Sequence, residues 1–272
     1  PWIHKHGNKY YMIYASHGVP ECISYSWSNS PTGPWEWKGI IMDKNQQGAA
    51  FTNHSGLIEF KGRNFFFYHN QRLPGGGGFA RSTAIEEFKW NADGTIPKMT
   101  MSNIGVVEPI HYLDPFKRVE AETKAYSYGL DAGKNNNGVY ITKIHNNDYI
   151  KVRCVDFGDM GADVFTASVN SRNNATIEIH LDKQDGELIG KMNVTNTNGT
   201  WKEIECEVNN TIGKHDLFFV FKGANNTELF DFDYWYFTTN AVIVPQTPYG
   251  GIPHKVPGKI EFEDYDEGGQ NR

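Results

Sequence analysis

Hydrophobic and polar residues alternate along much of this sequence. Residues 176–181, for example, read TIEIHL, so that every second side chain is apolar. This period of two is typical of β-strands that bury one face. It predicts short strands and turns over residues 1–107 and a second strand-rich segment over residues 118–239. Because no amphipathic helix of ordinary length is predicted, we expect an all-β fold.

Segments that contain several prolines divide the chain. Residues 108–117 carry two prolines and residues 240–258 carry four, so both are predicted linkers. The residues RVEAE after the first linker are echoed by KIEFE after the second. This repeat predicts that residues 259–272 form the truncated start of a second copy of the preceding domain. The sequence also lacks an initiator methionine and a signal peptide, and we expect it to be part of a longer polypeptide.

Composition favours a folded protein that binds neither nucleic acid nor a membrane. Hydrophobic residues make up 39% of the 272 residues, which is enough for a sizeable core. The formal net charge is −6, without long charged runs, so basic patches for nucleic acid or lipid are absent. No run of about 18 apolar residues exists to span a bilayer. Aromatic residues at 14% and 28 glycines suit an all-β protein with many turns, and exposed aromatic rings suit sugar recognition.

Cysteine and histidine spacing gives no metal motif. Three cysteines are too few for a disulfide framework. Cys154 and Cys206 each lie on the apolar face of an alternating strand, so two buried thiols and one disulfide bond are both open. His4 and His6 would share one face of a strand, but a zinc site needs a third ligand, which the sequence does not place.

Residues 1–107 carry a series of motifs in a recognisable order. These are PWIHKHGNKYY at 1–11, NHSGLIEFKG at 53–62, FFYH at 66–69, Arg81-Ser82 and NADGTI at 91–96. In order and spacing the segment resembles the C-terminal blades of glycoside hydrolase family 43, the five-bladed propeller arabinofuranosidases and xylosidases. The resemblance implies that the base Asp, a pKa-tuning Asp and the acid Glu lie upstream of Pro1, with the acid Glu just before it. None of the three catalytic carboxylates would then be in this chain.

The same resemblance assigns roles to two residues. His54 matches a histidine that faces the propeller axis and contacts a metal ion, usually calcium, or its water shell; a hydrogen-bonded core histidine is the alternative. Arg81 matches a substrate-contacting arginine, whose guanidinium can bind a sugar hydroxyl or orient the acid carboxylate; a surface ion pair is the alternative. Glu21, Glu36 and Glu59 match no catalytic position, and we expect them to be surface charges.

Residues 118–239 resemble a family 6 carbohydrate-binding module over the whole module. The motifs that carry this resemblance include EAE at 120–122, NGVYI at 137–141, NGTW at 198–201 and LFDFDY at 229–234. The implied fold is a β-sandwich of the jelly-roll type, following a partial five-bladed β-propeller. Tyr140 and Trp201 match two aromatic residues that sandwich a sugar ring, whose apolar face rests on an aromatic plane.

Two further features of the module come with this resemblance. Asp231 falls where the family commonly has an Asn that hydrogen-bonds the sugar. Because a carboxylate accepts but cannot donate unless it is protonated, the choice of ligand is open. Glu120, Glu122 and Asp233 match a structural calcium site that joins the first and last strands, and oxygen ligands of this kind suit calcium.

Together these resemblances imply part of a secreted enzyme that degrades hemicellulose. Intact, it would remove arabinofuranosyl or xylosyl residues from arabinoxylan or its oligosaccharides with inversion. The expected partners are xylan or arabinoxylan and the missing N-terminal propeller blades of the same polypeptide, with calcium as cofactor and with no nucleic acid or membrane. The alternative is a non-catalytic polysaccharide-binding or adhesive protein built of β-domains.

Overall fold

The computed structural model describes residues 1–73, 75–136, 138–240, 248, 251–253 and 255. Strands β1 to β18 are the regular elements of this part of the chain, which contains no α-helix. The all-β prediction is therefore confirmed. The chain divides into two compact units, Pro1–Ile110 and His111–Arg272.

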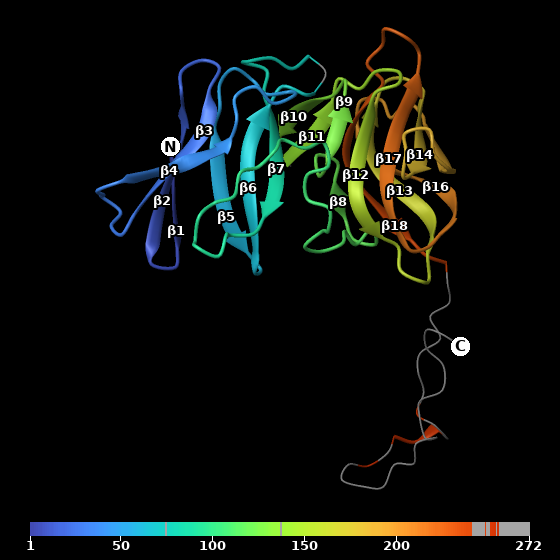
Figure 1. The fold of residues 1–272 in the computed structure, drawn as a ribbon. Coiled ribbons are helices and arrows are strands. Elements are labelled where there is room, and N and C mark those ends of the chain that lie inside the picture. Colours follow the sequence, from blue (N-terminus) through green and yellow to red (C-terminus); the bar gives the residue numbers. More distant parts are fainter. Residues whose placement is uncertain (74, 137, 241–247, 249–250, 254, 256–272) are drawn as a thin grey trace. The chain divides into compact units, whose positions relative to one another are not determined.

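The first unit contains two antiparallel sheets whose neighbouring strands follow one another along the chain (Figure 1). The four-stranded sheet has the order β1-β2-β3-β4, and the three-stranded sheet has the order β5-β6-β7. The strands are β1 Trp2–His6, β2 Lys9–Ser16, β3 Cys22–Ser28, β4 Glu36–Met42, β5 Ser55–Phe60, β6 Arg63–Asn70 and β7 Ser82–Phe88. Up-and-down sheets of this kind are what propeller blades are made of.

The core of the first unit is centred on β3. Six of its seven residues are buried, five of them consecutively, so both faces of the strand are covered. On the neighbouring β2, Tyr11 and Ile13 point inward. The hydroxyl of Tyr11 donates to the carbonyl of Gly94 at 2.6 Å, and the hydroxyl of Tyr25 accepts from the backbone N–H of Ile96 at 3.1 Å. These bonds satisfy the polar ends of two buried rings and fix the turn at 91–95 on the sheet.

The second unit is a sandwich of two antiparallel sheets. One sheet has the order β10-β11-β18-β13-β16, with β8 also paired to β18, and the other has the order β15-β14-β17-β12-β9. A single residue pair, Gly190 and Val208, connects β15 to β16 and so joins the two sheets along one edge. The strands are β8 Val119–Glu120, β9 Tyr126–Tyr128, β10 Asp131–Asn135, β11 Gly138–Thr142, β12 Tyr149–Asp156, β13 Ala162–Ser171, β14 Ala175–Leu181, β15 Leu188–Val194, β16 Trp201–Thr211, β17 Lys214–Gly223 and β18 Phe230–Thr238.

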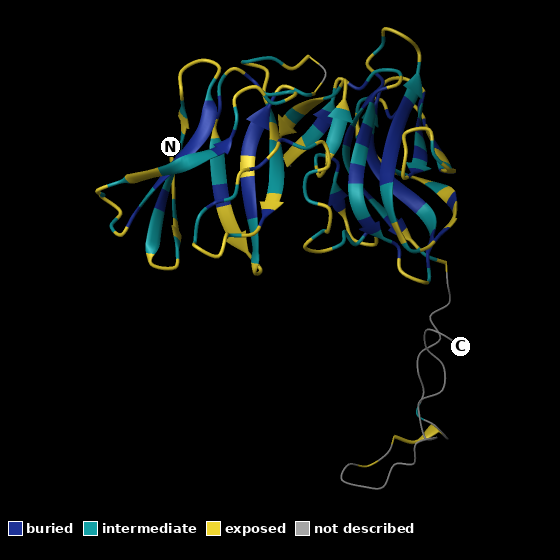
Figure 2. Cartoon of the chain, viewed as in Figure 1, coloured by how far each residue is buried: buried dark blue, intermediate teal, exposed yellow. Residues whose placement is uncertain are grey.

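The core of the sandwich has the period of two that the sequence predicts. In β14, alternate residues from Ala175 to Leu181 are buried, and those between them are only half-buried. In Figure 2 the buried residues lie mainly in the strands, while most loops are exposed or half-buried. The two sheets contribute a cluster of fully buried aromatic side chains, Phe165, Phe219, Phe232, Trp235 and Phe237. Because full burial of one such side chain contributes about 1.5–3 kcal/mol, this cluster is a main source of the unit's stability.

Of the two predicted linkers, the structure describes the first completely and the second only in part. Residues 111–117 are bonded into the second unit, because Leu113 forms a parallel bridge with Val155. The carbonyl of Pro115 also accepts from the backbone N–H of Phe237 at 2.8 Å. This part of the first predicted linker is therefore an edge of the sandwich. The second predicted linker, 240–258, is described only in part, and the predicted repeat at 259–272 lies outside the described residues.

Cys22, Cys154 and Cys206 are free thiols, so the alternative of a disulfide bond is not realised. Burial raises the pKa of the Cys206 thiol to about 11, which keeps it protonated and unreactive at neutral pH. Within the part of the chain that the structure describes, no helix has the length and apolar character that crossing a bilayer requires.

Candidate functional site

Residues from several strands of the second unit meet on the outer face of one sheet. Asn170 on β13 pairs with Asp231 on β18 and, on its other side, with Trp201 at the start of β16. Residues paired across neighbouring strands point to the same face of a sheet. Tyr140 on β11 reaches the same place, since its ring centroid lies 5.3 Å from that of Trp201. The structure thus brings together the three residues predicted to bind a sugar.

The two aromatic rings contact each other edge to face, with 70° between their planes. Gly133 on β10 pairs with Tyr140, and a Cβ at that position would lie 2.4 Å from Cζ of the tyrosine ring. The Tyr140 ring therefore lies directly over Gly133, which has no side chain to displace the ring. A sugar between two rings needs them parallel and one sugar thickness apart. The predicted sandwich is not formed in this arrangement, and one ring would have to turn before a sugar fits.

Asp231 lies beside the aromatic pair formed by Tyr140 and Trp201. Its Oδ1 accepts a hydrogen bond from Oγ1 of Thr142 at 2.6 Å, and its Oδ2 accepts a long one from Nδ2 of Asn170 at 3.5 Å. Burial raises the pKa of the Asp231 carboxyl, the bond from Thr142 lowers it, the charge of Glu228 raises it and that of Arg172 lowers it; the net result is a raised pKa. In its ionised form the group is an acceptor only.

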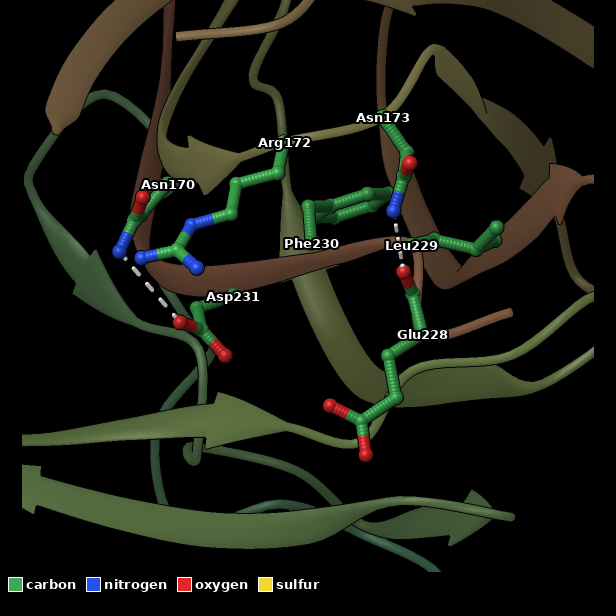
Figure 3. A pocket seen from close by; sticks show the side chains of 7 residues that line it. All are labelled: Asn170, Arg172, Asn173, Glu228, Leu229, Phe230 and Asp231. Atoms are coloured by element: carbon green, nitrogen blue, oxygen red, sulfur yellow. Dashed lines mark hydrogen bonds between the residues drawn. The ribbon is translucent and has the colours of Figure 1, made fainter. Parts of the chain in front are cut away.

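A cavity of about 310 Å³ lies next to Asp231 (Figure 3). Its lining comes from the turn after β13 and from the start of β18, and consists of Asn170, Arg172, Asn173, Glu228, Leu229, Phe230 and Asp231. Sequence reasoning missed Arg172, whose guanidinium is turned toward Asn170 and Asp231 in Figure 3. No local signal marks it, because only the pairing of β13 with β18 brings it to this cavity.

The predicted calcium ligands lie around the pairing of β8 with β18. Arg118 donates to both carboxylate oxygens of Glu120, at 2.8 and 3.0 Å, and lies 3.8 Å from Oδ2 of Asp233. Burial raises the pKa of the Asp233 carboxyl more than Arg118 lowers it. Oε2 of Glu122 is buried and has no hydrogen-bond partner among the described residues. In the described ranges no three His, Cys, Asp or Glu side chains form a group that could hold a metal, so the three carboxylates are not assembled around one point.

In the first unit, His54 and Arg81 both lie close to His69. His54 is exposed and lines a small cavity of about 50 Å³ together with Pro1 and Asn53. Arg81 is exposed just before β7. Burial lowers the pKa of the His69 ring, and the charges of Arg81 and His54 lower it further. His69 donates from Nε2 to the carbonyl of Thr52 at 2.8 Å. His69 lies in a motif noted above, yet its place between the two predicted residues depends on the fold.

Two glutamates that the sequence predicts as surface charges have defined partners. Oε2 of Glu21 accepts from the backbone N–H of Asn53 at 2.5 Å, which fixes the loop before β5 that carries His54. Oε1 of Glu59 lies 2.9 Å from Nε2 of His4 and 2.6 Å from Nδ1 of His6. The side chain that joins the two histidines therefore comes from β5 and connects the two sheets of the first unit.

Family models match both units. The model for glycosyl hydrolases family 43 matches residues 1–96, and the model for the family 6 carbohydrate-binding module matches residues 120–239. The chain is 38% identical to the arabinoxylan arabinofuranohydrolase of Bacillus subtilis (strain 168) over 260 residues, which is 87% of this chain and 50% of that protein. It is 33% identical to the arabinoxylan arabinofuranohydrolase of Paenibacillus polymyxa, covering 88% of this chain and 41% of that protein.

A solved structure gives the same result. The crystal structure of a glycoside hydrolase family 43 arabinoxylan arabinofuranohydrolase from Bacillus subtilis, in complex with cellotetraose, matches with a TM-score of 0.77 at 36% identity. The match covers 88% of this chain and 53% of that one. The chain thus spans about half the length of the curated relatives it matches. The fold is part of a five-bladed propeller followed by a β-sandwich, in which residues 1–96 match glycosyl hydrolases family 43 and residues 120–239 match the family 6 carbohydrate-binding modules.

Proposed function

We propose that this chain is part of a secreted glycoside hydrolase that acts on arabinoxylan and carries its own xylan-binding module. The observation that carries the proposal is that relatives named arabinoxylan arabinofuranohydrolase match both units in one alignment. A binding module on the same polypeptide raises the effective concentration of a polymeric substrate at the catalytic domain. Because such a polymer does not enter cells, the protein acts outside them.

The proposed reaction is hydrolysis of an arabinofuranosyl or xylosyl linkage with inversion. Inversion needs an acid and a base on opposite sides of the bond, with room for a water molecule. We place these carboxylates on a part of the enzyme that this chain does not include, since the chain spans about half of its relatives. In the complete site Arg81 would bind a sugar hydroxyl or orient the acid carboxylate, and His54 would face the axial metal ion or its water shell.

The second unit is proposed to hold the xylan chain. Trp201 and Tyr140 offer aromatic planes on which the apolar face of a xylosyl ring can rest while its hydroxyl groups stay solvated. Asp231 lies beside them and accepts a hydrogen bond from one hydroxyl. These three side chains are half-buried, so each offers part of its surface to a ligand.

Calcium is the proposed cofactor of this unit. The candidate ligands Glu120, Glu122 and Asp233 offer only oxygen atoms, which is the ligand type that calcium takes. The buried Oε2 of Glu122, which lacks a hydrogen-bond partner in the part of the chain that the structure describes, is an atom that a cation would satisfy. The fit is therefore good for Glu122. For Glu120 and Asp233 to bind the ion, both would have to give up their ion pairs with Arg118. Bound there, calcium would neutralise the carboxylates where the first strand meets the last.

Titration calorimetry of the 272-residue chain with xylohexaose tests the binding function. We expect saturable binding that weakens roughly tenfold in Trp201→Ala, because stacking contributes about 1 kcal/mol or slightly more. Trp37→Ala is the matched control, since Trp37 is an exposed tryptophan of the first unit. Absence of binding, or affinity unchanged in both Trp201→Ala and Tyr140→Ala, would contradict this part of the proposal.

An assay on aryl arabinofuranoside and aryl xyloside tests the catalytic part. The 272-residue chain should show no turnover, because each missing acid or base group is worth roughly 10²–10⁴-fold in rate. Turnover close to that of an intact relative would show that the catalytic groups lie within this chain after all.

A further inference from the structure

The Asp231 side chain, unlike an Asn at that position, brings no hydrogen-bond donor to the sugar site. An Asn at the position of Asp231 would offer both an acceptor oxygen and a donor N–H to a ligand, whereas the carboxylate offers oxygen atoms alone. One of these, Oδ1, already accepts from Thr142 at 2.6 Å. A sugar hydroxyl is a donor and an acceptor at once, so recognition of two neighbouring hydroxyls uses both kinds of protein group.

Arg172 is placed to supply that donor. It follows β13 by one residue, lines the same cavity as Asp231, and turns its guanidinium toward that carboxylate (Figure 3). It is close enough for its charge to act on the Asp231 carboxyl. Yet it forms no hydrogen bond or ion pair with any residue that the structure describes. Its five N–H groups are therefore open to the cavity or to solvent.

The loop that leads into Trp201 fixes the Arg172 side chain on its other side. Gly199 in this loop has a φ of +70°, and a Cβ there would lie 3.1 Å from Nε of Arg172. The arginine stem thus crosses the loop where the glycine leaves room. The guanidinium then lies between the loop that carries Trp201 and the carboxylate of Asp231. In this position the donor lies beside the acceptor.

We propose that Arg172 and Asp231 together bind two adjacent hydroxyl groups of one sugar ring, the guanidinium donating to one oxygen and the carboxylate accepting from the other. This inference rests on the proposed xylan-binding function and names its ligand class: a neutral sugar with a free pair of adjacent hydroxyls. An acidic sugar is disfavoured, because Glu228 and Asp231 both line the cavity and outnumber the one guanidinium. A sugar substituted on either hydroxyl is disfavoured because it cannot fill both bonds.

The test is titration calorimetry of the 272-residue chain with xylohexaose, using Arg172→Ala, Asp231→Asn and the double variant. Arg172→Ala should weaken binding roughly 3- to 10-fold, the range for one lost hydrogen bond. In the double variant the new Asn brings its own N–H, so affinity should return to within roughly twofold of the original. Arg153→Ala is the control, since it removes an arginine from the other sheet, and it should leave affinity unchanged. Thermal melts of each variant confirm that the fold is intact.

The outcomes separate the inference from the function beneath it. If Arg172→Ala binds like the original chain while Trp201→Ala loses affinity, the module binds xylan without Arg172 and the inference is wrong. The inference is equally wrong if the loss in Arg172→Ala is not restored by Asp231→Asn. If the unaltered chain does not bind xylohexaose at all, the proposed function fails and the inference fails with it.

Discussion

The two units differ in how far each covers its own apolar surface. In the second unit Phe165, Phe219 and Trp235 are fully buried between the sheets. Among the described residues, most exposed large apolar side chains belong to the first unit, including Val19, Trp37 and Phe79 at 72%, 57% and 88% exposure. The second unit therefore buries its largest aromatic side chains in its own core, whereas the first unit carries most of the exposed large apolar side chains of the described residues.

The same difference holds for their chemistry. The second unit gathers its candidate site from its own strands, with Tyr140, Asp231 and Trp201 close together. The first unit holds Arg81 and His54 near His69, but the resemblance assigns no catalytic carboxylate to it. We therefore expect that binding can be studied in this chain by itself and that catalysis needs the rest of the proposed enzyme.

The sharpest way to break this comparison is to remove one aromatic side chain from each unit. Phe219→Ala should destabilise the second unit by about 3–5 kcal/mol, because it opens a cavity in a closed core. Trp37→Ala should change the stability of the first unit by no more than about 0.5 kcal/mol, since the side chain is exposed. Calorimetric unfolding of the two variants measures both effects. Equal losses would contradict the difference in burial.

Calcium should stabilise the second unit and leave the first unit's unfolding transition where it is. A chelator should lower the melting temperature of the second unit by several degrees, because a ligand present at 100 times its Kd adds about 2.7 kcal/mol. Asp233→Ala should have a similar effect, whereas Glu187→Ala, which removes an exposed carboxylate elsewhere in the unit, should not. A metal-loaded sample whose melting temperature is insensitive to chelator would remove the proposed site.

Glu59 gives the first unit a pH dependence of its own. Burial raises the pKa of the Glu59 carboxyl, but hydrogen bonds from His4 and His6 outweigh it and lower the pKa below 4.5. A lowered carboxyl pKa contributes stability that is present above the ordinary pKa and is lost as the pH falls through the lowered one. Glu59→Gln should therefore cost up to about 1 kcal/mol at pH 7, as for other partly exposed pairs, and the cost should shrink as the pH falls through the lowered pKa. A cost that persists unchanged at acid pH would count against the ionic contribution.

In the second unit, ionisation of Asp231 should lower the stability as the pH rises, which is the opposite of the effect expected for Glu59. Its pKa is raised, chiefly by burial, so ionisation weakens the fold as the pH rises through that pKa. Asp231→Asn should raise the melting temperature at pH 7 by about 1–3 °C, since Asn still accepts from Thr142. The gain should vanish below pH 3.8, where both side chains are neutral. A variant that melts lower at pH 7 would mean that the carboxylate is a net stabilising group.

The local pattern was sufficient for the strands but not for the contacts between distant ones. The alternation at 176–181 corresponds to β14, and the motifs around Tyr140 and Trp201 correctly indicated residues that meet in space. Arg172 could not be predicted, because its place beside Asp231 follows from the order of strands in the sheet. The edge-to-face arrangement of the Tyr140 and Trp201 rings likewise depends on the pairing of β10 with β11, which places Gly133 opposite Tyr140.

Charged groups were the least predictable feature. The spacing of His4 and His6 placed both on one strand face, but it gave no indication of their partner, Glu59, which lies on a strand of the other sheet. The interaction of Arg118 with Glu120 and Asp233 likewise requires that β8 lies against β18. Ionic partners of this kind are set by tertiary contacts, for which sequence periodicity carries no information.

The pairing of β8 with β18 has a consequence for how the second unit is built into a polypeptide. Val119 near the start of the unit pairs with Trp235 near its end, and Phe237 bonds to Pro115, so the chain enters and leaves at the same place. A domain with adjacent ends can be inserted into another sequence, or cut out of it, while the flanking segments keep nearly the same separation. The sandwich can therefore be joined to a different catalytic domain, by evolution or by engineering, without redesign of either domain.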